Sequence, residues 1–228
     1  MLSFLSPWAP HFPILLVLLP LLGAVLSPLI GRGDRGWAWA VMTMGATTVV
    51  AIELLLRIRD VGAVSYPLGG WQAPFGIELH VDLLSAMIAL VVAVVGWVVT
   101  IYARASIRVE IPGDRLGAFW AVWLLAITGL LGILISGDAF NAYVLLEISS
   151  LTIYGLIAMG RSRDRKALVS AFNYLILGSI GASFILIAIG LLYAQTGTLN
   201  MADLRLRLLE GGSEATVNTA RAFLLAGL

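Results

Sequence analysis

Residues 116–160 read LGAFWAVWLLAITGLLGILISGDAFNAYVLLEISSLTIYGLIAMG. This run is apolar for about 45 residues, twice the roughly 20 that an α-helix needs to cross a bilayer, and only Gly137, Asp138 and Glu147 interrupt it. A Gly-Asp pair is typical of a tight turn in which the aspartate caps the next helix. The stretch therefore predicts two membrane helices joined at Gly137 and Asp138.

The remaining apolar runs extend this prediction to an all-α polytopic membrane protein. Charged residues bound four further segments of spanning length, at 11–30, 37–56, 81–103 and 167–193. Together with the two helices of 116–160 they make six transmembrane helices. A last apolar run begins at Ala220 and is still apolar at Leu228, so we expect it to be the start of a seventh helix that the chain leaves incomplete.

The loop between the second and third spans has a different pattern. The sequence IELHVD at 77–82 alternates apolar and polar residues, which is the period of a strand with one buried face. Turn-forming residues crowd the stretch 67–76 just before it. We therefore expect a short β-hairpin at 61–81. Its lone histidine, His80, is expected to be a solvated residue on the polar face.

The cations in the loops predict the orientation of the chain. Loops one, three and five carry nine Lys and Arg residues, whereas loops two, four and six carry four. Cytoplasmic loops are enriched in Lys and Arg. The odd loops are therefore expected to be cytoplasmic, with the N-terminus and the hairpin outside, and the expected location is the bacterial plasma (inner) membrane.

The composition excludes several classes of function. With 60% hydrophobic and 12% charged residues, the chain differs from a soluble domain, which carries about 25% charged residues. A net charge of +1 offers no basic surface for nucleic acid. There is no cysteine and there are only two histidines, so thiol, haem, iron–sulfur and zinc chemistry lack ligands. We predict no cofactor and no metal site, and a transporter subunit rather than an enzyme in its own right.

Glu147 is the principal candidate for a functional residue, because it falls near the middle of a predicted span. An ionised carboxylate there costs at least ~2.5 kcal/mol, so such residues are usually functional. Burial favours the protonated form and a nearby cation favours the ionised one, which suits a proton relay. Tyr143, Ser150 and Tyr154 share its helical face as one polar stripe. Tyr143, Ser150 and Asn173 in the sixth span are supporting candidates, and the alternative is that these polar residues only hold helices together.

A cationic partner for Glu147 is missing from the predicted spans. The nearest cation on its own helix, Arg161, is about 21 Å further along the axis. A second intramembrane acid, Glu53, has Arg57 four residues later. Glu53 and Arg57 are expected to form a surface pair that reaches the membrane edge.

Several ordered motifs are spread over essentially the whole chain: GGW at 69–71, PFGIEL at 74–79, VD at 81–82, SGDAFNAYV at 136–144, EISS at 147–150, NYLILGS at 173–179, LY at 192–193 and TGTLNM at 196–201. Together they resemble one known family, the antiporter-like subunits shared by Mrp-type cation/proton antiporters and respiratory complex I. Within this family the motifs look most like those of the D-type subunit of the Mrp antiporters.

The resemblance implies a larger architecture and a role for one residue. Family members contain two inverted repeats of five helices, the first of which begins at the fourth helix. Residues 1–115 would then be the three N-terminal helices with their hairpin, and 116–228 the start of the first repeat. Glu147 aligns with a glutamate that pairs with a seventh-helix lysine and is central to proton movement. That lysine would fall just beyond Leu228, so the chain is expected to be a fragment, a split gene product or a truncated protein.

Three functional hypotheses remain open. The first is a membrane subunit of a multi-subunit monovalent cation/proton antiporter, with other subunits, the lipid bilayer, protons and sodium as its partners. The second is a proton-pumping subunit of a complex I or membrane-bound hydrogenase-type NADH/quinone oxidoreductase, in which any dehydrogenase activity would belong to the complex. The third is a truncated scaffold that transports nothing.

Overall fold

The computed structural model describes residues 3–30, 34–160, 165–211 and 213–227, and these ranges contain six helices long and apolar enough to cross a membrane. Six predicted spans are thus confirmed. After a 3-10 helix, η1 (Ser3–His11), the spans are α1 (Phe12–Ile30), α2 (Asp34–Val61), α3 (Leu83–Glu110), α4 (Leu116–Ile135), α5 (Ala139–Met159) and α6 (Arg165–Thr196). Several of these helices extend past the apolar runs into charged residues, because long cationic side chains can reach the interface from a helix end.

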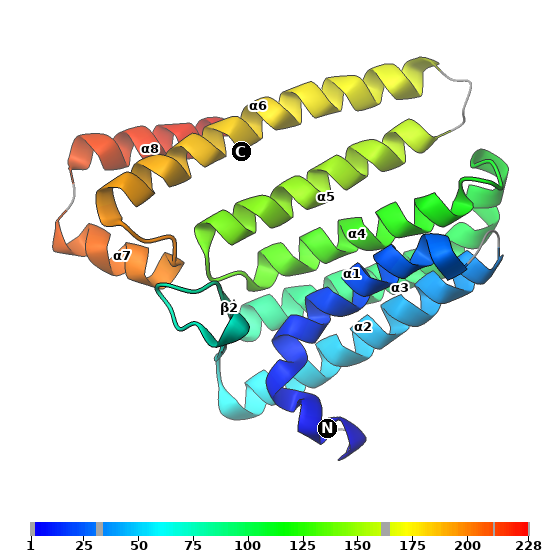
Figure 1. Cartoon of the computed structure of the whole chain (residues 1–228), viewed down its shortest axis with the longest axis horizontal. Coiled ribbons are helices and arrows are strands. Elements are labelled where there is room, and N and C mark those ends of the chain that lie inside the picture. The colour runs from blue at the N-terminus through cyan, green and yellow to red at the C-terminus, as the bar shows by residue number, and fades with distance from the viewer. Residues whose placement is uncertain (1–2, 31–33, 161–164, 212, 228) are drawn as a thin grey trace.

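The spans lie side by side in a bundle whose packing is uneven (Figure 1). Helices α1 to α4 form one group, α5 lies along α4, and α6 lies outermost. The most apolar stretches of α2 and α4 are half buried by the rest of the chain, whereas only 11% of that stretch of α5 and 17% of that of α6 are buried. One broad face of α5 and α6 is therefore left open.

Side-chain hydrogen bonds to backbone carbonyls join the first helices. The Trp37 indole donates to the Thr100 carbonyl at 3.0 Å, and the Trp39 indole donates to the Gly23 carbonyl at 2.9 Å. The Thr48 hydroxyl donates to the Ala93 carbonyl across the α2–α3 interface at 3.2 Å. Such contacts hold membrane helices together where burial in lipid gives no hydrophobic gain.

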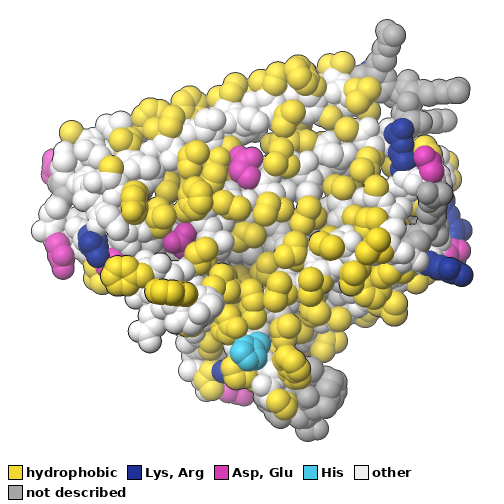
Figure 2. Space-filling model, viewed as in Figure 1, with side chains coloured by type: hydrophobic (Ala, Val, Ile, Leu, Met, Phe, Trp, Pro, Cys, Tyr) yellow, Lys and Arg dark blue, Asp and Glu magenta, His cyan; other side chains and the backbone are white. Residues whose placement is uncertain are grey.

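Most charged side chains on the visible face lie toward the ends of the bundle, and hydrophobic side chains fill most of the band between them, with an acidic side chain exposed within that band (Figure 2). At the end opposite the hairpin, Asp34 accepts from Arg104 and is also paired with Arg108. Arg104 lies over the Trp37 ring, 4.4 Å from its centroid. This distribution is the one expected for a protein solvated by lipid around its middle.

The predicted hairpin is present as a two-stranded antiparallel sheet of β1 (Val64–Pro67) and β2 (Glu78–Val81), in which Tyr66 faces Leu79. It is shorter than the predicted range of 61–81 because Val61 still belongs to α2. The predicted alternation is confirmed within β2, where Leu79 and Val81 are buried and His80 is exposed, whereas Ile77 lies before the strand and is exposed.

Asp82 caps the start of α3 directly after the hairpin. Its Oδ1 accepts hydrogen bonds from the Ser85 hydroxyl at 2.6 Å and from the Ser85 backbone amide at 2.7 Å. These bonds stabilise the ionised carboxylate and hold the pKa of Asp82 below its usual value, with the hydroxyl as the larger cause.

We expect Asp82→Ala to lower the stability of the chain by about 1 kcal/mol at neutral pH, because the cap is lost. A carboxyl whose pKa is depressed by folding stabilises the protein above the unfolded-state pKa of about 3.9 and loses that contribution as the pH falls through the folded-state value. The difference between wild type and variant should therefore shrink in acid. Thermal unfolding followed by circular dichroism measures it. Asp82→Asn also removes the titrating carboxyl, so its difference from wild type should change with pH in the same way, but it should lose less stability than Asp82→Ala at neutral pH because asparagine still caps the helix. Differences from wild type that stay constant with pH would count against the assignment.

The C-terminal part differs from the sequence prediction in its details. The polar connector expected before Ala220 contains a helix of its own, α7 (Met201–Glu210), whose N-cap is Asn200. The next helix, α8 (Glu214–Gly227), begins six residues earlier than expected and packs along α6 (Figure 1). Gly181 and Gly227 lie at this crossing, where a Cβ added to Gly181 would be 2.8 Å from the Gly227 carbonyl oxygen.

The surface position predicted for Glu53 is wrong. Instead of lying at the surface with Arg57, Glu53 is only 4% exposed, inside the group formed by α1 to α4. The i,i+4 spacing shows that the two residues share a face, but α2 is packed by α1 on one side and α3 on another, so only the packing identifies its inner face.

Candidate functional site

The α4–α5 turn sets the depth of the candidate relay residue. Asp138 is the N-cap of α5, and its Oδ1 accepts the Asn141 backbone amide at 2.8 Å, which confirms the predicted cap. The Asn141 side chain in turn donates to the Ser136 hydroxyl at 2.9 Å. Counting from this fixed start, Glu147 lies within two residues of the midpoint of α5, as the sequence predicted.

Glu147 is half-buried rather than fully buried by the described part of the chain. Tyr143, Ser150 and Tyr154 are also half-buried, and helical spacing puts all four on one face of α5. None of the ion pairs found among the described residues involves Glu147. The described residues thus leave all four side chains of this α5 face partly exposed.

One member of the stripe contacts the next helix. Tyr154 and Tyr174 of α6 have ring centroids 5.9 Å apart, and the Tyr154 hydroxyl lies against Gly178. Asn173 is exposed and lies on the far side of this contact, so it is more than ~10 Å from Glu147 along the helix axes. The structure thus groups Tyr143 and Ser150 with Glu147 but does not bring Asn173 to it.

Small residues on α4 let α5 approach closely on its opposite face. A Cβ added at Gly129 would lie 2.7 Å from the Ser149 Cβ and 2.8 Å from the Leu145 carbonyl oxygen. The same α5 residue, Leu145, fills the space beside Gly132. This contact fixes the rotation of α5, and hence the direction in which the Glu147 stripe faces.

At the hairpin end of the bundle, three connecting segments meet in a junction that no sequence pattern predicted. The Asn200 amide donates to the Glu78 carboxylate at 2.6 Å, across 122 residues of sequence. The backbone amide of Gly137 donates to the Glu78 carbonyl at 2.8 Å, and that of Met201 donates to the Gly137 carbonyl at 2.9 Å. The hairpin, the α4–α5 turn and the α6–α7 connection are therefore tied together.

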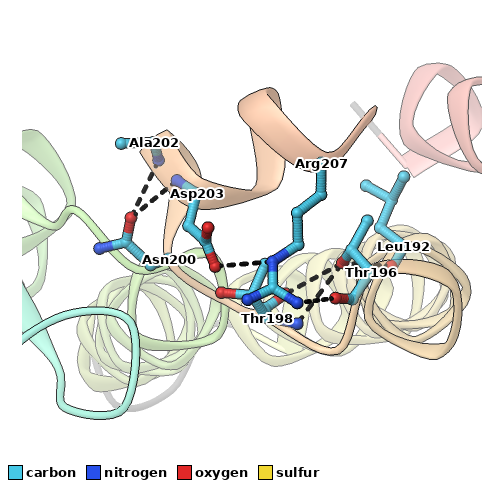
Figure 3. A network of polar contacts seen from close by, with 7 residues as sticks. All are labelled: Leu192, Thr196, Thr198, Asn200, Ala202, Asp203 and Arg207. Carbon is cyan, nitrogen blue, oxygen red and sulfur yellow. Dashed lines mark hydrogen bonds and ion pairs between the residues drawn. The ribbon is translucent and has the colours of Figure 1, made fainter. Parts of the chain in front are cut away.

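Asn200 is central to this junction because both the oxygen and the nitrogen of its side-chain amide form hydrogen bonds. Its Oδ1 accepts the backbone amides of Ala202 and Asp203 at 3.1 Å and so caps α7 (Figure 3). Its Nδ2 donates to the Glu78 carboxylate. Arg207 stabilises the same segment by donating to Asp203 and to the Thr196 carbonyl. Asn200 is only 2% exposed. An asparagine directly before a helix was the sequence signal that could have revealed it.

We expect Asn200→Asp to destabilise the junction by about 1–3 kcal/mol. Aspartate caps a helix as well as asparagine does, but here it loses the donor to Glu78 and puts two carboxylates together. Thermal unfolding in a lipid nanodisc measures the loss. Adding Glu78→Gln supplies a new donor and should restore most of the stability; a double variant no better than the single one would show that the contact contributes little.

Taken together, the fold and this arrangement define a polytopic membrane protein with an ionisable group at the middle of a span. Comparison with known families agrees: residues 136–228 match the family described as NADH:quinone oxidoreductase/Mrp antiporter, transmembrane. The resemblance inferred from the motifs is thereby confirmed, and the chain is related to the N-terminal part of the antiporter-like subunits.

Two curated relatives show the range of this family. The N-type subunit of an NADH-quinone oxidoreductase from Desulforudis audaxviator is 41% identical over 226 residues, covering 96% of this chain. The D-type subunit of a Na(+)/H(+) antiporter from Bacillus subtilis is 31% identical over 218 residues, covering 94% of this chain. The chain spans 43% of the length of each.

Solved structures share the fold. A chain of the membrane-bound sulfane sulfur reductase, an archaeal respiratory membrane complex, superposes with a TM-score of 0.86 at 29% identity, over 94% of this chain and 43% of that one. A chain of the Mrp complex from Dietzia has a TM-score of 0.82 at 22% identity, over 96% of this chain and 40% of that one, which is evidence for the fold alone.

Proposed function

We propose that this chain forms the N-terminal part of a membrane subunit of a multi-subunit monovalent cation/proton antiporter, and that Glu147 relays protons within it. The observation that carries the proposal is the place of Glu147: a carboxylate near the middle of a span, within a polar stripe, in a chain similar to a Na(+)/H(+) antiporter subunit along most of its length. An ionisable side chain in the middle of a span raises the free energy of membrane insertion, so its presence there is best explained by a function.

The open face of α5 and α6 supports the proposal that further helices pack there and complete the site around Glu147. Residues 116–228 form the start of the first antiporter-like repeat, after the three helices of residues 1–115, and α8 is the beginning of its seventh helix. Further helices, on the same or another polypeptide, cover the open face, complete the burial of Glu147 and supply its cationic partner. The low burial of α5 and α6 by the described residues fits such a cover.

The same proposal includes the membrane location and the orientation of the chain. The chain lies in a bacterial inner membrane with its N-terminus and hairpin outside, in contact with the other subunits of the complex. The excess of Lys and Arg in the odd loops supports this orientation, although the cations at 31–33 and 161–164 lie outside the described residues. Tyr143 and Ser150 assist Glu147 by hydrogen bonding to water beside it.

A redox-driven proton pump is the second candidate, and specific observations favour it. The identity to the NADH-quinone oxidoreductase subunit is higher than that to the Na(+)/H(+) antiporter subunit, 41% against 31%, and the respiratory reductase chain superposes well. In this case Glu147 keeps the same role while the driving force comes from electron transfer in other subunits. A scaffold without transport is the third candidate.

Isolation of the native complex through a tag on this chain, followed by reconstitution in vesicles, discriminates between the three. The antiporter proposal predicts that a sodium pulse collapses a pH gradient without any electron donor. Proton pumping that starts only on addition of NADH would select the redox complex instead. A complete complex that shows neither activity would favour the third candidate, a scaffold without transport.

A further inference from the structure

The outer surface of α3 differs in composition from its inner surface. The buried residues of α3 are all small: Ala86, Ala89, Ala93, Gly96 and Thr100. From Leu83 to Tyr102, the exposed residues of α3 are instead large, being leucine, isoleucine, valine and methionine, with Tyr102 itself 79% exposed. Small residues mark the surfaces on which membrane helices pack, whereas lipid chains are as apolar as leucine. The outer surface of α3 therefore has the composition of a surface that faces lipid.

Helix α6, which is also poorly buried by the described residues, has a different composition. Its exposed residues include Asn173 and Ser179 beside the apolar ones, and Gly178 between them is half-buried. Polar and small residues of this kind are the ones on which further membrane helices pack. Of the two helices, α3 is thus the one whose outer surface suits lipid rather than another helix.

Aromatic side chains indicate that the last turns of α3 lie at the depth of the lipid headgroups. Trp37, near the start of α2, donates its indole N–H to the Thr100 carbonyl at 3.0 Å, and Tyr102 is exposed on α3. Tryptophan and tyrosine are enriched where membrane and water meet. Arg104 follows Tyr102 by two residues and is the first charged residue of α3. The charges at this end of α3 therefore fall in the headgroup layer.

Two guanidinium groups are held side by side there. Arg104 Nε donates to Asp34 Oδ1 at 3.3 Å, and Arg108 Nη2 is paired with the same oxygen. Arg104 also lies over the Trp37 ring, 4.4 Å from its centroid. A guanidinium has five N–H donors, so both arginines keep donors that none of the bonds found among the described residues uses. The two side chains are 46% and 45% exposed, so a ligand outside the bundle can reach them.

The charge of this cluster is positive. Arg104 and Arg108 carry two positive charges against the one negative charge of Asp34, and Arg35, the next residue of α2, is exposed and adds a third positive charge. Glu110 follows Arg108 by two residues, which puts it about 200° round the helix and away from the cluster. The cluster therefore complements an anion, and planar guanidinium groups match the geometry of a phosphate.

We propose that Arg104 and Arg108 bind the phosphate of an anionic phospholipid whose acyl chains lie along the outer surface of α3. Ile101 and Val94 precede Arg108 by seven and fourteen residues, so they share its face of the helix and lie about 10 and 21 Å toward the middle of the membrane. An acyl chain covers about 15 Å, half of the hydrocarbon core, and so fits along this face. The proposal concerns lipid contact alone, so it holds equally for an antiporter subunit and for a redox-driven one.

Binding is tested on the full 228-residue chain in detergent micelles by native mass spectrometry, with phosphatidylglycerol and phosphatidylcholine as the probes. The first phosphatidylglycerol should bind at least about tenfold more tightly than phosphatidylcholine, because cations at headgroup depth attract anionic lipid. This preference should fall as the ionic strength rises. Arg104→Gln combined with Arg108→Gln should remove it. Arg59→Gln combined with Arg205→Gln, which removes the same charge from exposed positions at the hairpin end, should leave it unchanged.

A phosphatidylglycerol with a photoreactive headgroup locates the lipid on the wild type, so the test stands even if the double variant fails to fold. Its cross-links should fall at 34–37 and 104–108. Equal affinities of the wild type for the two lipids, cross-links confined to the hairpin end, or the same loss in both double variants would each overturn the proposal. Displacement of the lipid by an equal concentration of glycerol phosphate, or cross-linking of the outer surface of α3 to another subunit in the native complex, would overturn it as well.

Discussion

Replacement of Glu147 by glutamine is expected to reduce proton-coupled transport by the completed complex about 100-fold or more, to the background of vesicles without it. Glutamine has the shape of glutamate and can still hydrogen-bond to its surroundings, but it cannot take up and release a proton. Assembly should be unaffected, because glutamine fills the same space and none of the ion pairs found among the described residues depends on the Glu147 charge. The measurement is sodium-induced collapse of a pH gradient in vesicles, or NADH-driven proton uptake if the complex is a redox pump.

Glu110→Gln is the matched control for this change. Glu110 is exposed at the last position of α3, outside the middle of the membrane, so losing its charge should leave transport near the wild-type level. Full activity of Glu147→Gln, or an equal loss in both variants, would refute the assigned role of Glu147.

The second large effect is expected at the α4–α5 interface. Gly129→Leu should force α4 and α5 apart, since even a Cβ at this position would stand 2.7 Å from Ser149. Overpacking of this kind costs about 1–3 kcal/mol or more, and it would also turn the Glu147 stripe away from its place. We expect a lower unfolding temperature together with loss of transport.

Gly190→Leu in α6 tests whether the position rather than the residue type matters. A Cβ at Gly190 meets nothing within 4 Å among the described residues, so this variant of the chain should unfold as the wild type does. If Gly129→Leu behaved in the same way, the close approach of α4 and α5 would not be what sets the orientation of α5.

The membrane spans could be predicted from the sequence because their cause is local. A helix in lipid must be apolar over its own length and must form its backbone hydrogen bonds within itself. The residues at 116–160 were therefore sufficient to predict α4 and α5. The Asp138 cap and the hairpin strand at Leu79 and Val81 were equally local, since capping and alternation depend on neighbouring residues.

The parts that the sequence did not reveal depend on contacts between distant segments. The burial of Glu53 is one of them, because helical spacing shows which residues share a face but not what packs against that face. The Asn200–Glu78 bond is set by the meeting of three connecting segments. Helix α7 was not predicted because a polar helix of ten residues contains no apolar run that would indicate it.

The central claim is that Glu147 changes its protonation state within the membrane, and infrared difference spectroscopy of the assembled complex during a pH titration tests it most directly. A protonated carboxyl group gives a carbonyl stretch that a carboxylate or an amide lacks. We expect such a titrating band in the wild type and its loss in Glu147→Gln, with the band retained in Glu110→Gln. Wild-type and Glu147→Gln spectra that remain identical through the titration would contradict the claim.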